Sequence, residues 1–188
     1  MKSPSSCRRS GFTLIELLVV IAIIVVLAAA SFGMIPTMMN KAKRLTSVAA
    51  ASALESAVNN FYAEYGSLPD VGDKVKTNSG EGIRLLNILL GLEGSSGKVQ
   101  NTRSIKLLTV QETKTKSKGL LYHPSGKSVE GLYDAWGSPF TVELDIQYEE
   151  RLRISLGDKT TVLNGRRVAV YSPGADKKLG TSDDVKTW

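Results

Sequence analysis

The strongest constraint on this chain is a long apolar run near its N-terminus that contains one carboxylate, Glu16. No charged residue occurs from Leu17 to Ile35, a stretch of about nineteen residues, and a helix of that length crosses a bilayer core of about 30 Å. A charge in such a core costs roughly 2.5–3.5 kcal/mol, so Glu16 should have a partner or a role. A buried core helix or a secretory signal is the alternative, but the apolar region of a signal is usually shorter.

Basic residues are concentrated before the apolar run. Lys2, Arg8 and Arg9 supply half of the net charge of +6. This distribution predicts one membrane pass, with the N-terminus in the cytoplasm and the C-terminal part exported. The rest of the chain is only mildly basic, so nucleic-acid binding is not expected. The only cysteine, Cys7, also lies before the run, and the exported part must therefore fold without a disulfide.

Three segments are predicted in the N-terminal third: a polar leader over 1–11, a membrane helix over 12–36 and an amphipathic helix over 37–66. The simplest prediction is one continuous helix that is disturbed at Gly33 and Pro36, because proline removes a helical hydrogen bond. The apolar residues of the second half recur every three or four positions on one helical face. They are Ala51, Leu54, Val58, Phe61 and Tyr65.

The remainder is predicted to be a loop region followed by a sheet. Residues 67–132 are rich in Gly, Ser and Lys around one apolar patch, Ile83–Leu92, where a short helix is expected. Residues 133–188 contain PFTVELDI and RLRISL, which alternate apolar and polar side chains as strands do. Asn164-Gly165 is a two-residue hairpin signal. These patterns predict the α+β class, with a long N-terminal helix packed on a C-terminal antiparallel β-sheet.

The sequence offers no recognisable catalytic set. His123 is the only histidine and is expected in a surface loop, while Trp136 and Trp188 are expected to be packing residues. The sequence has no Ser/His/Asp combination, no phosphate-binding loop and no cysteine–histidine metal motif. We therefore expect a substrate of an enzyme and not an enzyme.

The segment GFTLIELLVVIAII resembles the prepilin signature of type IV pilins and of the pseudopilins of type II secretion systems. The resemblance implies that a membrane peptidase cuts between Gly11 and Phe12 and methylates the new N-terminal amine of Phe12. It further implies that Glu16, the fifth residue after the cut, neutralises the N-terminal amine of a neighbouring subunit during assembly. The physics agrees, because two charges that are badly placed in an apolar bundle relieve each other. The alternative is that Glu16 lies at the membrane interface and reaches water.

Three further segments resemble those of major pseudopilins, in the same order. They are FYAEYGSLPD, YDAWGSPF and the C-terminal YSPGADKKLGTSDDVKTW. The last resembles a calcium loop, and the resemblance implies that the carboxylates of Asp176, Asp183 and Asp184 bind calcium, with backbone carbonyls of Pro173 and Thr181 completing the shell. Calcium prefers six to eight oxygen ligands, which these groups could help to supply. The alternative is a loop in which the aspartates cap turns.

The resemblance therefore implies a structural subunit of a type II secretion pseudopilus with a pilin-like fold. Its expected partners are other copies of itself in a helical filament, the prepilin peptidase, minor pseudopilins and the inner-membrane assembly platform. Its expected location is the bacterial inner membrane in a single pass, with the C-terminal domain in the periplasm, and then the periplasmic pseudopilus. The alternatives are a type IV pilin for adhesion, motility or DNA uptake, and a membrane-anchored calcium-binding protein that does not polymerise.

Overall fold

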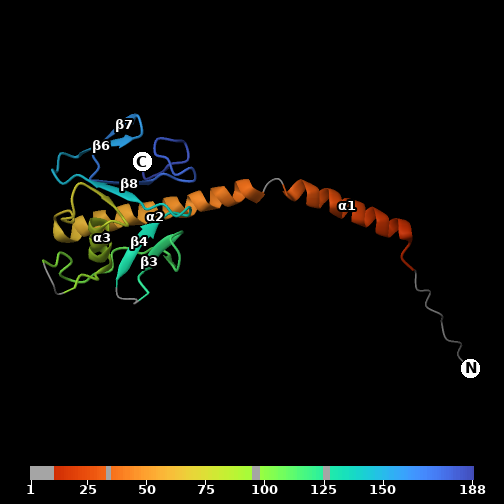
Figure 1. Cartoon of the computed structure of the whole chain (residues 1–188), viewed down its shortest axis with the longest axis horizontal. Helices are drawn as coiled ribbons and strands as arrows, with labels where there is room; N and C mark the ends of the chain where they lie inside the picture. The colour runs from red at the N-terminus through yellow and green to blue at the C-terminus, as the bar shows by residue number, and fades with distance from the viewer. Residues whose placement is uncertain (1–10, 33–34, 95–97, 125–127) are drawn as a thin grey trace, which may run out of the picture. The chain divides into compact units, whose positions relative to one another are not determined.

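The fold is α+β: α-helices and mainly antiparallel β-sheets share one main core, and the one parallel pair among the described strands is β2 (Glu112–Thr113) with β3 (Gly119–Tyr122) (Figure 1). The computed structural model describes residues 11–32, 35–94, 98–124 and 128–188. The predicted leader over 1–11 therefore lies outside the described residues except for its last residue, Gly11. The chain forms two compact units that divide between Asn40 and Lys41.

The first unit contains helix α1, Leu14–Phe32. Its large side chains are apolar on every face and remain exposed, from Val20 at 45% to Leu14 at 82%. Within the described part of the chain, no helix combines the length and the hydropathy needed to cross a membrane. The predicted membrane helix over 12–36 also includes residues 33–34, which lie outside that part.

Helix α2, Ile35–Tyr65, carries the predicted amphipathic face. Ala51, Leu54, Val58 and Phe61 are at most 1% exposed, so the face inferred from periodicity is the buried one. The structure gives α1 and α2 as separate elements, but residues 33–34 between them lie outside the described residues, so one continuous helix stays a prediction. Pro36 is the second residue of α2, where its missing N–H costs little because the first amides of a helix have no helical acceptor.

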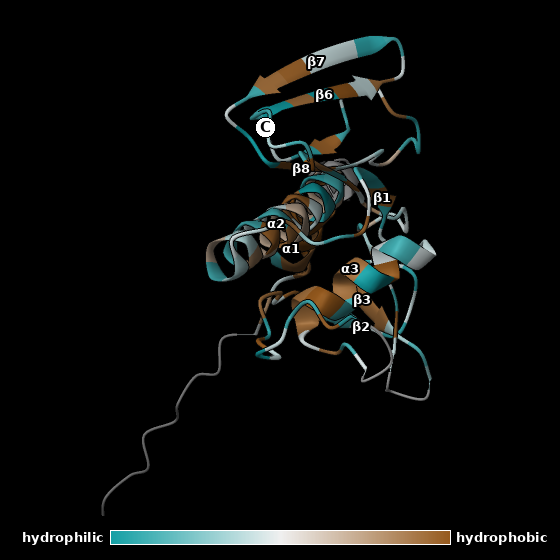
Figure 2. Ribbon diagram, turned by 90° about the vertical axis from the view of Figure 1, so that its left-hand side faces the viewer, coloured by the Kyte–Doolittle hydropathy of each residue, from teal (hydrophilic) through white to brown (hydrophobic). Residues whose placement is uncertain are grey.

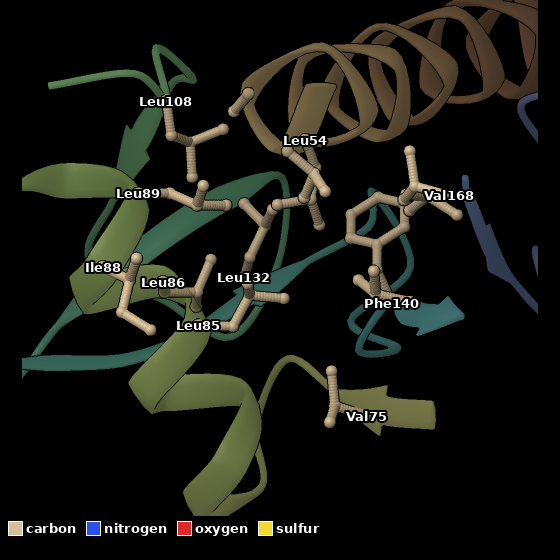
Figure 3. Packing of buried hydrophobic residues seen from close by; sticks show 14 of the residues in the cluster. Leu54, Val75, Leu85, Leu86, Ile88, Leu89, Leu108, Leu132, Phe140 and Val168 are labelled. Atoms are coloured by element: carbon tan, nitrogen blue, oxygen red, sulfur yellow. The ribbon is translucent and has the colours of Figure 1, made fainter. Parts of the chain in front are cut away.

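Helix α2 packs on a four-stranded antiparallel sheet. The sheet has the order β1 (Lys74–Lys76), β5 (Thr141–Leu144), β8 (Val168–Ser172), β9 (Val185–Lys186). Leu54 lies beside Phe140 and Val168 in the core between the helix and this sheet (Figure 3). The predicted sheet is confirmed for β5 and β8.

The region 67–132 is more ordered than the predicted loop region. It contributes β1 to the main sheet and a three-stranded sheet in the order β2 (Glu112–Thr113), β3 (Gly119–Tyr122), β4 (Val129–Tyr133). Helix α3, Gly80–Leu90, contacts β4, so the expected short helix is confirmed. These strands have two to five residues, and they escaped prediction because their places are set by pairing with other strands and not by a local pattern.

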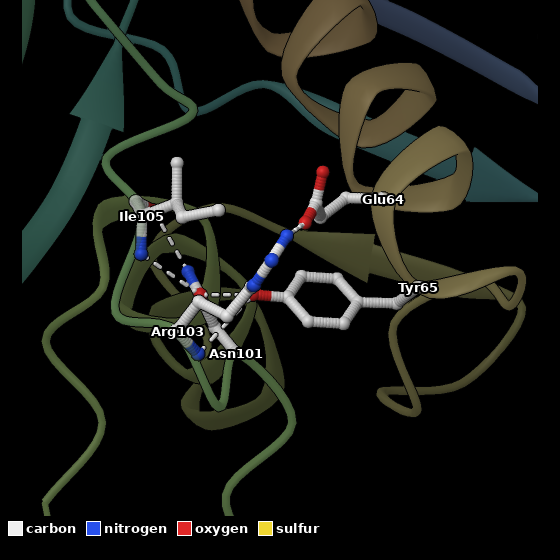
Figure 4. A network of polar contacts seen from close by, with 5 residues as sticks. All are labelled: Glu64, Tyr65, Asn101, Arg103 and Ile105. Carbon is white, nitrogen blue, oxygen red and sulfur yellow. Dashed lines mark hydrogen bonds and ion pairs between the residues drawn. The ribbon is translucent and has the colours of Figure 1, made fainter.

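Polar contacts hold the segment after α3 against the end of α2 (Figure 4). The hydroxyl of Tyr65 donates to Oδ1 of Asn101 at 2.6 Å, and Arg103 forms an ion pair with Glu64. The side-chain nitrogen of Asn101, Nδ2, donates to the backbone carbonyls of Ile88 and Ile105 at 2.7 and 2.8 Å. Asn101 is 1% exposed, and these bonds replace the water that its amide loses on burial.

The hairpin prediction at Asn164-Gly165 was wrong. Strand β7 (Lys159–Asn164) pairs with β6 (Arg151–Leu156), whereas β8 pairs with β5 and β9. The β6–β7 hairpin turns instead at Gly157-Asp158, where Gly157 has φ 56°. Strand β8 is buried along its whole length, whereas β7 is almost fully exposed. The two strands therefore lie in different sheets, although they are consecutive in the chain.

The close approach of α3 to β1 generates a stability prediction. A Cβ at Gly82 would lie 1.8 Å from the carbonyl oxygen of Lys76, whereas a Cβ at Gly80 would meet nothing within 4 Å. Gly82→Ala should therefore lower the free energy of unfolding by about 1–3 kcal/mol, the usual cost of overpacking. Gly80→Ala, in the same helix, should be neutral or stabilise by up to about 1 kcal/mol. Urea unfolding of both variants tests this, and equal stabilities would contradict it.

Candidate functional site

The N-terminal candidate site begins with exposed residues that precede α1. Gly11 and Phe12 are exposed, and Thr13 is the last residue before the helix. The backbone amide and the hydroxyl of Thr13 both donate to Oε2 of Glu16, at 2.9 and 2.8 Å. The amide of Glu16 donates in return to the Thr13 hydroxyl at 3.3 Å. Glu16 thus has a partner within its own chain.

This reciprocal arrangement is a capping box. In a capping box, a Ser or Thr before the helix and a Glu or Gln three residues later satisfy amides that lack helical acceptors. The Thr13-x-x-Glu16 spacing was present in the sequence and was not used in predicting a role for Glu16. A carboxylate can accept about four hydrogen bonds, so these two bonds leave Glu16 able to accept a further donor.

The C-terminal candidate site is the loop between β8 and β9. Asp183 organises it: Oδ2 accepts the amides of Ala175 and Asp176 at 2.7 and 3.0 Å, and Oδ1 accepts the Thr181 hydroxyl. The bond from Thr181, followed by those amides, lowers the pKa of Asp183. Gly174, with φ 68°, allows the loop to close, because a Cβ there would lie 2.2 Å from the Asp183 carbonyl oxygen.

The other two aspartates have different environments. Asp176 is exposed, and its Oδ1 accepts the amide of Lys178 at 2.8 Å. Asp184 is 1% exposed, and its Oδ2 accepts the amide of Gly180 at 3.0 Å. Within the described residues, Oδ1 of Asp184 is buried and has no hydrogen-bond partner. A buried anionic oxygen without a donor is costly, and a bound cation would satisfy it.

The structure does not gather the three carboxylates into one ligand cluster. In the described residues, no group of three or more His, Cys, Asp or Glu side chains is placed to hold a metal ion. Pro173 is half-buried after β8, and Thr181 uses its hydroxyl on Asp183 and on the Lys178 carbonyl. Asp183 thus caps the turns of this loop. The calcium prediction depends on Asp184 and stays a prediction.

The ends of this loop are firmly attached to the fold. The Arg166 guanidinium donates to Oε1 of Glu55 in α2 and to the carbonyl of Thr187, both at 3.0 Å. Trp188 packs edge-on against Tyr171 with ring centres 5.9 Å apart. Burial and the bond from its hydroxyl to Glu143 raise the pKa of Tyr171 to about 12. No local sequence pattern indicates the role of Arg166, because its partners are distant in the chain.

The remaining candidates behave as predicted. Trp136 packs against the main core and Trp188 against a second cluster around Tyr171, so both are packing residues. His123 is exposed in the connection after β3.

Comparison with known proteins supports the N-terminal assignment. The family described as "Prokaryotic N-terminal methylation motif" matches residues 6–32. No curated protein and no solved structure matches the chain. The motif indicates a type IV pilin-like protein that a prepilin peptidase processes. It also implies, in general terms, an N-terminus anchored in the membrane and assembly into filaments.

Proposed function

We propose that this protein is the major structural subunit of a type II secretion pseudopilus. The observation that carries the proposal is the methylation motif over residues 6–32, which includes helix α1 and its apolar side chains exposed on every face. Such a helix is stable only in lipid or against other apolar helices. In this proposal α1 is stored in the inner membrane and then forms the apolar core of a periplasmic filament. The protein itself catalyses no reaction.

Two observations favour a pseudopilin over an adhesive or motile pilin. Cleavage after Gly11 would remove Cys7, so the mature chain would contain no cysteine and could not use a disulfide to hold its C-terminal end. The C-terminal loop instead contains a buried Asp184 oxygen that has no hydrogen-bond partner in the described part of the chain and suits a cation. The other expected partners are the prepilin peptidase, minor pseudopilins and the inner-membrane assembly platform. Subunit addition at the membrane would then drive export through an outer-membrane pore.

We further propose that calcium binds the C-terminal loop. Asp184 and Asp176 would supply carboxylate oxygens, and rearranged Asp183 or the carbonyls of Pro173 and Thr181 would supply others. Calcium would replace repulsion between these carboxylates with shared attraction to one ion. Because the loop joins β8 to β9, such cross-linking would hold the C-terminal strand on the sheet.

Processing is the first test of the proposal. Mass spectrometry of the protein purified from membranes should find methylated Phe12 at the N-terminus, and Gly11→Val should leave the leader attached because its side chain obstructs the peptidase. The leader variant should also fail to form filaments, whereas Gly80→Ala, at a glycine with open space around it and no positive φ, should be cleaved normally. A mature N-terminus at any other residue would contradict the proposal.

The role of Glu16 can be separated into capping and charge. Glu16→Gln keeps a capping box but removes the charge, whereas Glu16→Ala removes both. If the carboxylate pairs with the amine of a neighbour, both variants should insert into the membrane and both should lose filaments by at least about tenfold. Thr13→Val keeps the charge and should cost only the cap, about 0.5–2 kcal/mol. Normal filament yield from Glu16→Gln would show that the pairing role is wrong.

Calcium binding predicts a thermal shift of the processed chain in detergent. A ligand present at a hundredfold its Kd and bound only by the folded state stabilises by about 2.7 kcal/mol. Calcium should therefore raise Tm and slow proteolysis after Ser172, and magnesium should substitute poorly because it demands octahedral geometry. Asp184→Asn and Asp176→Asn should each remove most of the response, and the exposed hairpin change Asp158→Asn should not. An unchanged Tm in millimolar calcium would leave the loop as a capped turn and favour a generic pilin.

A further inference from the structure

The side chain of Leu45 protrudes from the part of α2 that belongs to the second unit. Leu45 is 71% exposed, the highest value among the large apolar side chains described between residues 41 and 188. Its neighbours Arg44 and Thr46 are also exposed. A leucine on a folded surface gains free energy when another surface removes it from water, so Leu45 is available as an anchor for an apolar contact.

The same helix borders a small apolar groove. The groove has a volume of about 330 Å³ and lies between α2 and the segment 109–111. Alanines at positions 49, 50 and 53 line its helical wall. Gly119 lines it as well and lets β3 approach the opposite wall, because a Cβ at Gly119 would lie 2.1 Å from the Gln111 carbonyl oxygen. Larger residues at these alanines would fill the space that a leucine could occupy.

The protruding leucine and the groove lie on different sides of α2. At 3.6 residues per turn, Leu45 is rotated by about 90° from the mean direction of Thr46, Ala49, Ala50 and Ala53. One copy can therefore fill its neighbour's groove while its own groove receives a third copy. A contact between two different patches of the same chain is heterologous, and repeated without closure it produces a filament.

We propose that Leu45 of one subunit inserts into the groove of the next subunit in the filament. The contact joins residue 45 of one copy to residues 49–53 of the other, which for parallel helices is a stagger of about 6–12 Å. The proposed pairing of the Phe12 amine with Glu16 joins residue i to residue i+4 in the same sense. Both contacts thus join a residue of one copy to a residue farther along the sequence of its neighbour. The inference rests on the proposed assembly into filaments and specifies which surfaces carry it.

Disulfide cross-linking tests the contact directly. The processed chain contains no cysteine once Cys7 is removed, so a paired variant reports one contact only. Filaments of Leu45→Cys/Ala53→Cys, or of Leu45→Cys/Ala49→Cys, should give a ladder of covalent oligomers on oxidation, because a disulfide needs Cα atoms within about 7 Å. The matched pair Leu45→Cys/Asn59→Cys places the second thiol at least about 9 Å farther along α2 and should give none.

The outcomes separate this inference from the function on which it rests. If the cysteine-free parent forms no filaments in cells that assemble pilin-like proteins, the proposed function fails. If the parent forms filaments but neither test pair gives a ladder, or if the Asn59 pair gives an equal ladder, this inference alone is overturned. A cross-link from Leu45→Cys to an unrelated protein, in place of a second copy, would overturn it as well.

Substitutions supply a second measurement that does not depend on oxidation. Leu45→Asn removes the apolar anchor, and Ala49→Trp fills the groove from an exposed position of α2. Each should reduce filament yield at least tenfold while membrane insertion and Tm stay unchanged. Val162→Asn changes another exposed apolar residue, at 44% exposure, and should have no effect. Normal yield from both Leu45→Asn and Ala49→Trp would contradict the contact.

Discussion

The second unit depends on the hydrogen bonds that the buried carboxylate of Asp134 accepts. Asp134 is fully buried, and its oxygens accept the amides of Trp136 and Ser138 and the hydroxyl of Ser172, at 2.8–2.9 Å. These donors are neutral, so hydrogen bonds compensate the loss of water around the charge. The adjacent amide, of Ala135, donates to the Ser47 hydroxyl in α2 at 2.9 Å. One turn thereby fixes the helix, the connection into β5 and the end of β8 relative to one another.

Strand β8, held in this way, separates two apolar clusters. Val168 and Val170 belong to the main core with α2, while Ala169 and Tyr171 belong to a second cluster with residues of β6, and Leu163 and Trp188 pack against that cluster. Figure 2 shows β8 between α2 and the β6–β7 hairpin. A strand that is buried on both faces carries no alternating pattern, and other elements must pack on each of its two faces. Helix α2 packs on one face of β8, and the β6–β7 hairpin packs on the other. An isolated two-stranded hairpin is marginally stable, so β6 and β7 depend on β8 as much as β8 depends on them. The C-terminal loop starts at the Asp134–Ser172 bond and therefore leaves the sheet from a fixed point.

Sequence patterns predicted the parts of the fold whose burial follows a period. The face of α2 and the helix near Ile83 were found because burial and periodicity coincide there. Strands β5 and β8 are buried along their whole length, and they were found because their residues favour strands and turn signals lie nearby. The short strands β1 and β2 were missed, since their place is set by pairing with distant residues. Asn164-Gly165 misled because a local turn signal does not state which strands will pair. At the candidate sites, Gly11, Phe12 and Glu16 came from a recognisable motif, and the Thr13-x-x-Glu16 spacing is a local sequence signal for their contact. The lack of a hydrogen-bond partner for Asp184 Oδ1 among the described residues depends on three-dimensional placement.

The capping box changes what the charge of Glu16 means for the proposed filament. A helix that starts in lipid leaves amides without acceptors, and each such group costs several kcal/mol. By accepting the Thr13 amide, the carboxylate offsets part of its own cost while the subunit is stored singly in the membrane. Cleavage after Gly11 would then create an amine one residue before Thr13, and that cation would need a partner as well. Because Glu16 retains acceptor capacity, a neighbouring amine can be added without breaking the cap. Assembly would therefore satisfy the new cation and leave the start of α1 intact.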